Sequence, residues 1–115
     1  MTNTNTAALR SEEILWLVQV DFPSDGPFGD EMANGYAELA HGIAQEPGLI
    51  WKLWTENSET GEAGGVYLFT AEEDARAYLK MHSARLAGWG ITGVRGKVFQ
   101  VNRSLSQITR GLPSA

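Results

Sequence analysis

His82 and Arg85 are the two side chains of this sequence that we single out for acid–base chemistry. An imidazole with an ordinary pKa of about 6.5 exchanges protons near neutral pH, and a guanidinium donates hydrogen bonds to an anionic oxygen. Residues three apart lie on the same side of a helix, so both groups can reach one ligand. Two other interpretations stay open: a core histidine bonded to its neighbours, and a surface arginine.

Large aromatic residues are the second feature of the sequence that could serve a binding site. Four tryptophans are many for a chain of this length, and all lie at or beside expected strands: Trp16, Trp51, Trp54 and Trp89. Flat rings suit a planar ligand, so Trp54 with Tyr67 and Phe69 predicts a pocket for an aromatic molecule, and we add Trp51 to this set. Alternatively, the rings fill a small core or a dimer interface.

Other catalytic and cofactor-binding patterns are absent or misplaced. Residues 88–93 spell G-x-G-x-x-G, but they follow an expected helix and open a strand, the reverse of a dinucleotide-binding turn. His41 lies off the apolar stripe of its helix and is expected at the surface. With no cysteine and no ligand-type residue four positions after either histidine, we expect no metal and no bound cofactor.

The pattern of apolar residues predicts the elements that position these groups. Strict alternation predicts strands at about 14–22, 49–56, 63–69 and 94–101. Helical spacing predicts helices at 30–45 and 71–87, with Asp30 capping the first and Thr70 to Glu73 forming a capping box for the second. The buried stripe of the second helix is Ala75, Leu79, His82 and Leu86. A hairpin loop is expected at 57–61, and a short helical turn at 104–108.

The resulting βαββαβ order predicts an α+β, ferredoxin-like fold: a four-stranded antiparallel sheet with two helices on one face. Several strands are apolar on both faces, however: Leu15 and Leu17 oppose Trp16 and Val18, Ile50 and Trp54 oppose Trp51 and Leu53, and Tyr67 and Phe69 oppose Val66 and Leu68. An open sheet face is normally polar at alternate positions. We therefore expect a homodimer that covers the open face. Gly64-Gly65 indicates either a bulge or a close approach of a ligand to the backbone.

Bulk properties narrow the function further. The 115 residues give one domain, expected at 13–110, between a flexible arm at 1–12 and a tail at 111–115. A net charge of −5 with nine scattered basic residues argues against nucleic acid. No run of about 18 apolar residues is present, so no membrane span is expected. The polar start does not have the layout of a signal peptide, which predicts a cytoplasmic location.

Several runs of the sequence resemble the YdhR-like monooxygenase family of the dimeric α/β-barrel superfamily. They are DGPFGDEM (25–32), QEPGLIWKLWTE (45–56), EAGGVYLFT (62–70) and HSARL (82–86), extended by KVF (97–99) and LSQI (105–108). The resemblance covers nearly everything from Trp16 to Ile108, in order and with similar spacing.

The resemblance implies a homodimer of ferredoxin-like units and a cofactor-independent monooxygenase acting on a phenol- or quinol-type aromatic molecule. In such chemistry the electron-rich substrate itself reduces dioxygen. His82 would then accept the substrate proton, Arg85 or Asn57 would stabilise the oxyanion, and Trp54 and Tyr67 would form stacking walls. The alternative is a dimer that binds small aromatic ligands without chemistry.

Overall fold

The structure, a computed structural model, describes residues 13–112; the predicted arm at 1–12 and residues 113–115 lie outside this range. Eight elements follow in order: β1 (Trp16–Pro23), α1 (Gly29–Gly35), α2 (Ala37–Ile43), β2 (Leu49–Asn57), β3 (Glu62–Phe69), α3 (Glu72–Gly88), β4 (Arg95–Gln100) and α4 (Arg103–Ile108). Within the described range, none of the helices combines the length and apolar character that crossing a bilayer requires.

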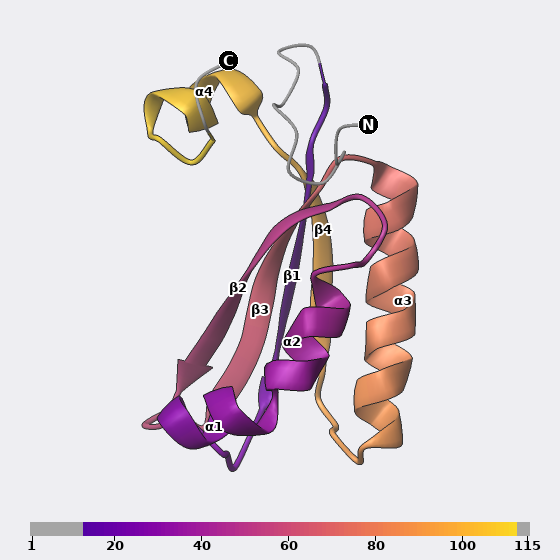
Figure 1. Ribbon diagram of the computed structural model, residues 1–115. Coiled ribbons are helices and arrows are strands. Elements are labelled where there is room, and N and C mark those ends of the chain that lie inside the picture. The colour runs from indigo at the N-terminus through magenta and orange to yellow at the C-terminus, as the bar shows by residue number, and fades with distance from the viewer. Residues whose placement is uncertain (1–12, 113–115) are drawn as a thin grey trace.

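The four strands form one antiparallel sheet in the order β2-β3-β1-β4, with α2 and α3 lying along it (Figure 1). The predicted α+β, ferredoxin-like architecture is confirmed. Each strand is antiparallel to its neighbours, and the register is continuous through the centre, where Val18 pairs with Tyr67 on one side and with Val98 on the other. Tyr67, at the centre of this register, forms part of the wall of the site described below.

Two apolar clusters lie on opposite faces of the sheet. The larger lies under the helices and joins Val18, Tyr67 and Phe69 to residues of α2 and α3. The smaller lies on the open face, where Leu15 and Leu68 contact Leu112, beyond the end of α4. The predicted alternation in β1 and β3 is therefore correct, and only part of the open face is covered by the chain itself.

The predicted alternation in β2 is wrong at its first residues. The pairing of β2 with β3 shifts register between Leu49 and Trp51, so one extra residue is accommodated there. Ile50 consequently packs with Trp51 on the open-face cluster instead of sharing the helix side with Trp54. Beyond this irregularity, alternation resumes and Lys52 and Trp54 face the helices.

The helix predicted at 30–45 is divided into α1 and α2 at Tyr36, whose φ of −110° and ψ of 10° leave the helical range. Gly35 precedes the break, and a glycine weakens a helix by about 1 kcal/mol relative to alanine.

The predicted N-terminal caps of the two helices are wrong. The N-cap residues are Phe28 for α1 and Ala71 for α3, and neither makes a side-chain cap bond. Because Ala71 and not Thr70 is the N-cap residue of α3, Thr70 and Glu73 do not occupy the positions of a capping box.

Gly64 and Gly65 mark a close approach and not a bulge, because both residues stay paired with β1 and β2. A Cβ atom on Gly64 would lie within 2.0 Å of the Val20 carbonyl oxygen. A Cβ atom on Gly65 would lie 2.6 Å from the Cε atom of Lys52. The approach is thus made by the protein's own strands, and Gly65 leaves the space in which the Lys52 side chain lies.

Candidate active site

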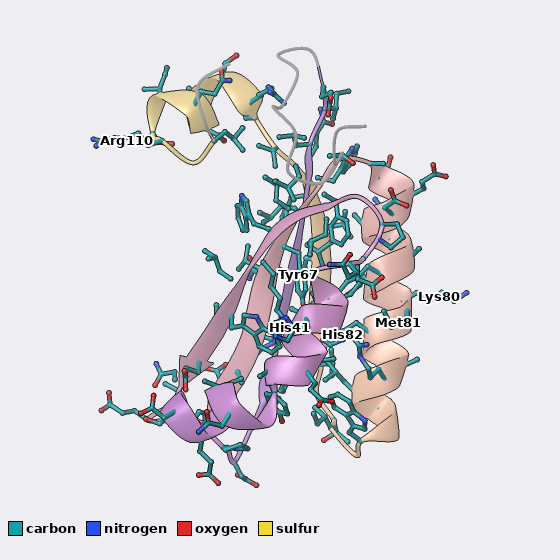
Figure 2. All side chains as sticks on the ribbon, in the orientation of Figure 1. His41, Tyr67, Lys80, Met81, His82 and Arg110 are labelled. Carbon is teal, nitrogen blue, oxygen red and sulfur yellow. The ribbon has the colours of Figure 1, made fainter. Side chains whose placement is uncertain are left out.

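The site lies between the sheet and the helices, where three elements converge. Tyr78, His82 and Arg85 are four and three residues apart on α3 and therefore share the face that meets the sheet. Tyr67 points toward them from β3, and Figure 2 shows Tyr67 and His82 between the sheet and α3. Lys52 reaches the same place from β2, where it pairs with Tyr67.

His82 is buried, at 5% exposure, and its ring is held by Arg85. The guanidinium Nη2 lies 2.8 Å and Nε lies 3.2 Å from Nδ1 of His82. Since arginine only donates, Nδ1 must accept, and the proton of the neutral ring sits on Nε2. No described residue accepts a hydrogen bond from that Nε2–H. Burial, with the positive charges of Arg85 and Lys52, lowers the pKa of His82 to about 4. His82 is therefore a neutral donor at physiological pH.

Two tyrosines extend this arrangement into the sheet. The Tyr78 hydroxyl lies 3.4 Å from Nη2 of Arg85 and donates to the Tyr67 hydroxyl, also at 3.4 Å. Their rings lie 4.8 Å apart between centroids, and Tyr78 stacks on the His82 ring at 5.2 Å. Burial raises the pKa of both phenols, and for Tyr67 the neighbouring Tyr78 raises it further. Both phenols stay protonated and act as rigid neutral walls.

Lys52 is the charged group on the sheet side of the site. Its Nζ lies 3.3 Å from the ring centroid of Trp54 and 4.6 Å from that of Tyr67. No carboxylate within the described part of the chain pairs with Lys52 or with Arg85. Burial, with a smaller contribution from Arg85, lowers the pKa of Lys52 from 10.5 to about 7.

A small cavity of about 30 Å³ lies against these groups and has room for roughly one water molecule. Its lining includes Lys52, Trp54, Tyr67 and His82, while Arg85 lies behind His82 and does not line it. An open groove of about 760 Å³ lies alongside. The two spaces share five lining residues: Phe22, Met32, Tyr36, Trp89 and Ile91. The groove has the size of a small-molecule site and forms the approach to the inner cavity.

The structure brings together some of the predicted site residues and separates others. His82, Trp54 and Tyr67 line the inner cavity. Phe69 is fully buried and stacks on Tyr67 and Tyr78 from beneath. Trp51 lies on the opposite face of the sheet, packed on the smaller cluster.

Asn57 also lies apart from the cavity, at the end of β2. Its Oδ1 accepts hydrogen bonds from the backbone N–H groups of Glu59 and Thr60 at 3.0 and 3.1 Å. This bonding orders the hairpin turn, as an asparagine at the start of a turn commonly does. Its carbonyl oxygen is already used, and neither Asn57 nor Trp51 lines the cavity.

Lys52, Tyr36 and Tyr78 were not predicted as site residues. A lysine two residues from Trp54 on an alternating strand shares its face, so the period of two contained the signal for Lys52. Tyr36 stacks on Trp54 with 6.3 Å between ring centroids, a contact that depends on the break between α1 and α2. Tyr78 lies four residues before His82, within the same helical stripe.

Within residues 13–112, no group of three or more histidine, aspartate or glutamate side chains is placed to hold a metal ion. The cavity is lined by aromatic and aliphatic side chains, one amine and one imidazole N–H. This set suits an aromatic ligand that carries an acidic oxygen.

Comparison with known families gives one match. A family model described as "Putative mono-oxygenase ydhR" matches residues 17–112, which includes all four strands apart from the first residue of β1. A comparison with curated proteins finds no match. The matched range contains every residue that lines the inner cavity.

Proposed function

The chain belongs to the ydhR family of mono-oxygenase-like proteins, and from this membership we propose a monooxygenase that acts on a phenol-type aromatic molecule without a bound cofactor. The substrate would enter through the open groove and place its acidic oxygen at the inner cavity. Dioxygen is the second substrate, and the ionised ring supplies the electrons.

One observation carries this proposal. Two hydrogen-bond donors, the Lys52 amine and the Nε2–H of His82, line one cavity, and within residues 13–112 neither has a protein acceptor or a carboxylate beside it. Donors that line a cavity and have no protein acceptor are available to bind a ligand. An anionic oxygen in the inner cavity would satisfy both donors, and the flat ring that carries it would lie toward the groove, against Phe22, Tyr36 and Trp89, which line both spaces.

The geometry refines the roles expected of His82 and Arg85. With Nδ1 occupied by Arg85 and the ring neutral, His82 donates to the substrate oxygen through Nε2–H. Arg85 fixes the tautomer and the orientation of that ring and adds positive charge behind it. Arg85 thus acts through His82, as a positioning residue.

The reaction is balanced without a further reductant. An anthrone-type substrate that carries an activated CH₂ group would react with O₂ to give the C=O product and water. The substrate anion passes an electron to dioxygen, a C–O bond forms between the ring carbon and the reduced oxygen, and the O–O bond breaks as water leaves. The protein's part is to generate the anion, hold it in place and keep bulk water away.

Oxygen consumption by the metal-free protein tests the proposal. A panel of anthrones and hydroquinones should show protein-dependent uptake, with spontaneous oxidation subtracted. Trp54→Leu should raise KM because it removes the ring that holds the Lys52 amine at the inner cavity, while Trp51→Leu on the opposite face should leave KM unchanged. Tight binding, seen as tryptophan quenching, without oxygen uptake from any compound would instead favour the ligand-binding alternative.

We also propose that a second copy of the chain covers the open sheet face. Leu53 and Phe99 lie on that face, opposite the helices, and are 61% and 46% exposed. Exposed large apolar groups on a sheet face commonly mark an interface. Sedimentation equilibrium should give a dimer for the native protein and a monomer for Leu53→Glu. The control, Met81→Glu, changes an exposed apolar residue of α3, on the helix side of the sheet, and should remain dimeric. A monomeric native protein would contradict the proposal.

A further inference from the structure

Lys52 is an unusual residue to find on the helix-facing side of a sheet. Its neighbours on this face are the rings of Trp54 and Tyr67, and its stem crosses β3 at Gly65, where any side chain would collide with its Cε. A lysine here loses hydration and gains no carboxylate in return within the described range. Such a position is costly for a purely structural residue.

Burial, and then the positive charge of Arg85, disfavour the protonated form of Lys52, and the ring contacts with Trp54 and Tyr67 offset only part of this. From α3 it faces the cation Arg85, the neutral ring of His82 and, behind them, Tyr78, and from β3 it faces the protonated phenol of Tyr67. Tyr36 lines the cavity from the break between α1 and α2. None of these groups is an anion. With a pKa of about 7, a large share of Lys52 is the free amine at neutral pH, which is the state required of a base.

His82 is the other nitrogen base among the residues that line the cavity, and its geometry excludes it as the catalytic base. A base needs an available lone pair, and the only lone pair of the neutral ring, on Nδ1, already accepts from Arg85. The Nε2 atom carries the proton. Protonating this ring would place a second charge directly against the guanidinium.

We propose that Lys52 is the catalytic base of the site, and that the site selects weakly acidic aromatic ligands, phenols and enols, and holds them as anions. The neutral Nζ takes the proton of the substrate O–H, which leaves a lysine ammonium beside a phenolate. The Nε2–H of His82 donates to the same oxygen. No electrons are transferred in this step. The inference deepens the proposed function and rests on the same cavity.

Binding of 4-nitrophenol tests the inference without any oxygen chemistry, since its phenolate absorbs visible light and the phenol does not. At a pH below the probe's own pKa in solution, the native protein should bind it with the phenolate spectrum. Lys52→Met should bind the neutral phenol, or bind at least tenfold more weakly. Lys80→Met, on the outer side of α3 (Figure 2), should behave as the native protein does. A phenolate spectrum of equal strength in Lys52→Met would overturn the inference, as would a native protein that binds no phenolate.

A second variant separates charge from proton transfer. Lys52→Arg keeps the cation but cannot release its proton, so it should bind added phenolate yet lose the rise in oxygen uptake that the native protein shows as pH increases through about 7. If phenolate forms in a Lys52-dependent way and no oxygen is consumed, the monooxygenase proposal fails and the assignment of Lys52 stands. If oxygen uptake and its pH profile are unchanged in Lys52→Met, the assignment of Lys52 fails and the monooxygenase proposal stands.

Discussion

Replacing Arg85 by Met is expected to lower turnover by about 10²-fold, with a smaller change in KM. The arginine donates to Nδ1 of His82 at 2.8 and 3.2 Å, so its removal frees the ring to adopt the other tautomer and to turn away. The oxygen of the substrate anion would then lose its fixed donor. The initial rate of oxygen uptake over a range of substrate concentrations gives kcat and KM separately.

The same variant has a signature that is independent of turnover. Without the guanidinium, the pKa of His82 should rise from about 4 toward the ordinary value of 6.5, although burial still keeps it below that value. Titration of the ring nitrogens by ¹⁵N NMR measures this directly. Arg76→Met is the control, because Arg76 lies on the same helix, pairs with Glu72 and is 59% exposed. An unmoved His82 pKa, or full turnover in Arg85→Met, would contradict the role given to Arg85.

Replacing Lys52 by Met is expected to stabilise the fold at pH 7, by roughly 2 kcal/mol. The pKa of Lys52 is 10.5 in the unfolded chain and about 7 in the folded protein. As pH falls from 10.5 to 7, the unfolded chain takes up a proton that the folded protein does not, so the native protein loses stability across this window. The cation–π contacts with Trp54 and Tyr67 offset part of the loss, by about 1–2 kcal/mol.

Urea unfolding of both proteins at several pH values measures this difference. The two free energies of unfolding should agree above pH 10.5 and diverge as pH falls to 7, with the variant higher. Lys80→Met should follow the native curve. Lower stability of Lys52→Met at pH 7 would show that the amine is well accommodated in its charged form, and would remove the basis for assigning it as a base. A functional residue that destabilises its own fold is a common trade-off.

Much of the fold could be predicted because β1 and β3 alternate without interruption. Leu17 and Leu68 on one face, and Val18 and Tyr67 on the other, follow a period of two that also places the helices. The irregularity near Ile50 could not be predicted, since the run is apolar on both sides and either register buries it. The break at Tyr36 could not be predicted either, and the stacking of Tyr36 on Trp54 that accompanies it is a contact made across elements.

The candidate site was predicted only in part, because its aromatic residues and histidine could be recognised in the sequence and Lys52 could not. Aromatic rings and a histidine on an apolar stripe are visible in a sequence, and Trp54, Tyr67 and His82 do meet at one cavity. A lysine is most often a solvated surface residue, so the alternation that places Lys52 on the same face as Trp54 identifies a site residue only once the strand register puts that face under the helices. Asn57 shows the converse: its polar side chain suggested a ligand contact, and it orders a turn instead.

The most direct test of the central claim is the fate of labelled dioxygen. Metal-free protein, an anthrone-type substrate and ¹⁸O₂ should yield a product in which mass spectrometry finds one ¹⁸O atom, formed at a rate proportional to protein concentration and lost in Lys52→Met. Product that carries no label, or whose labelling does not depend on the protein, would contradict a monooxygenase at this cavity and leave a protein that binds aromatic anions without oxidising them.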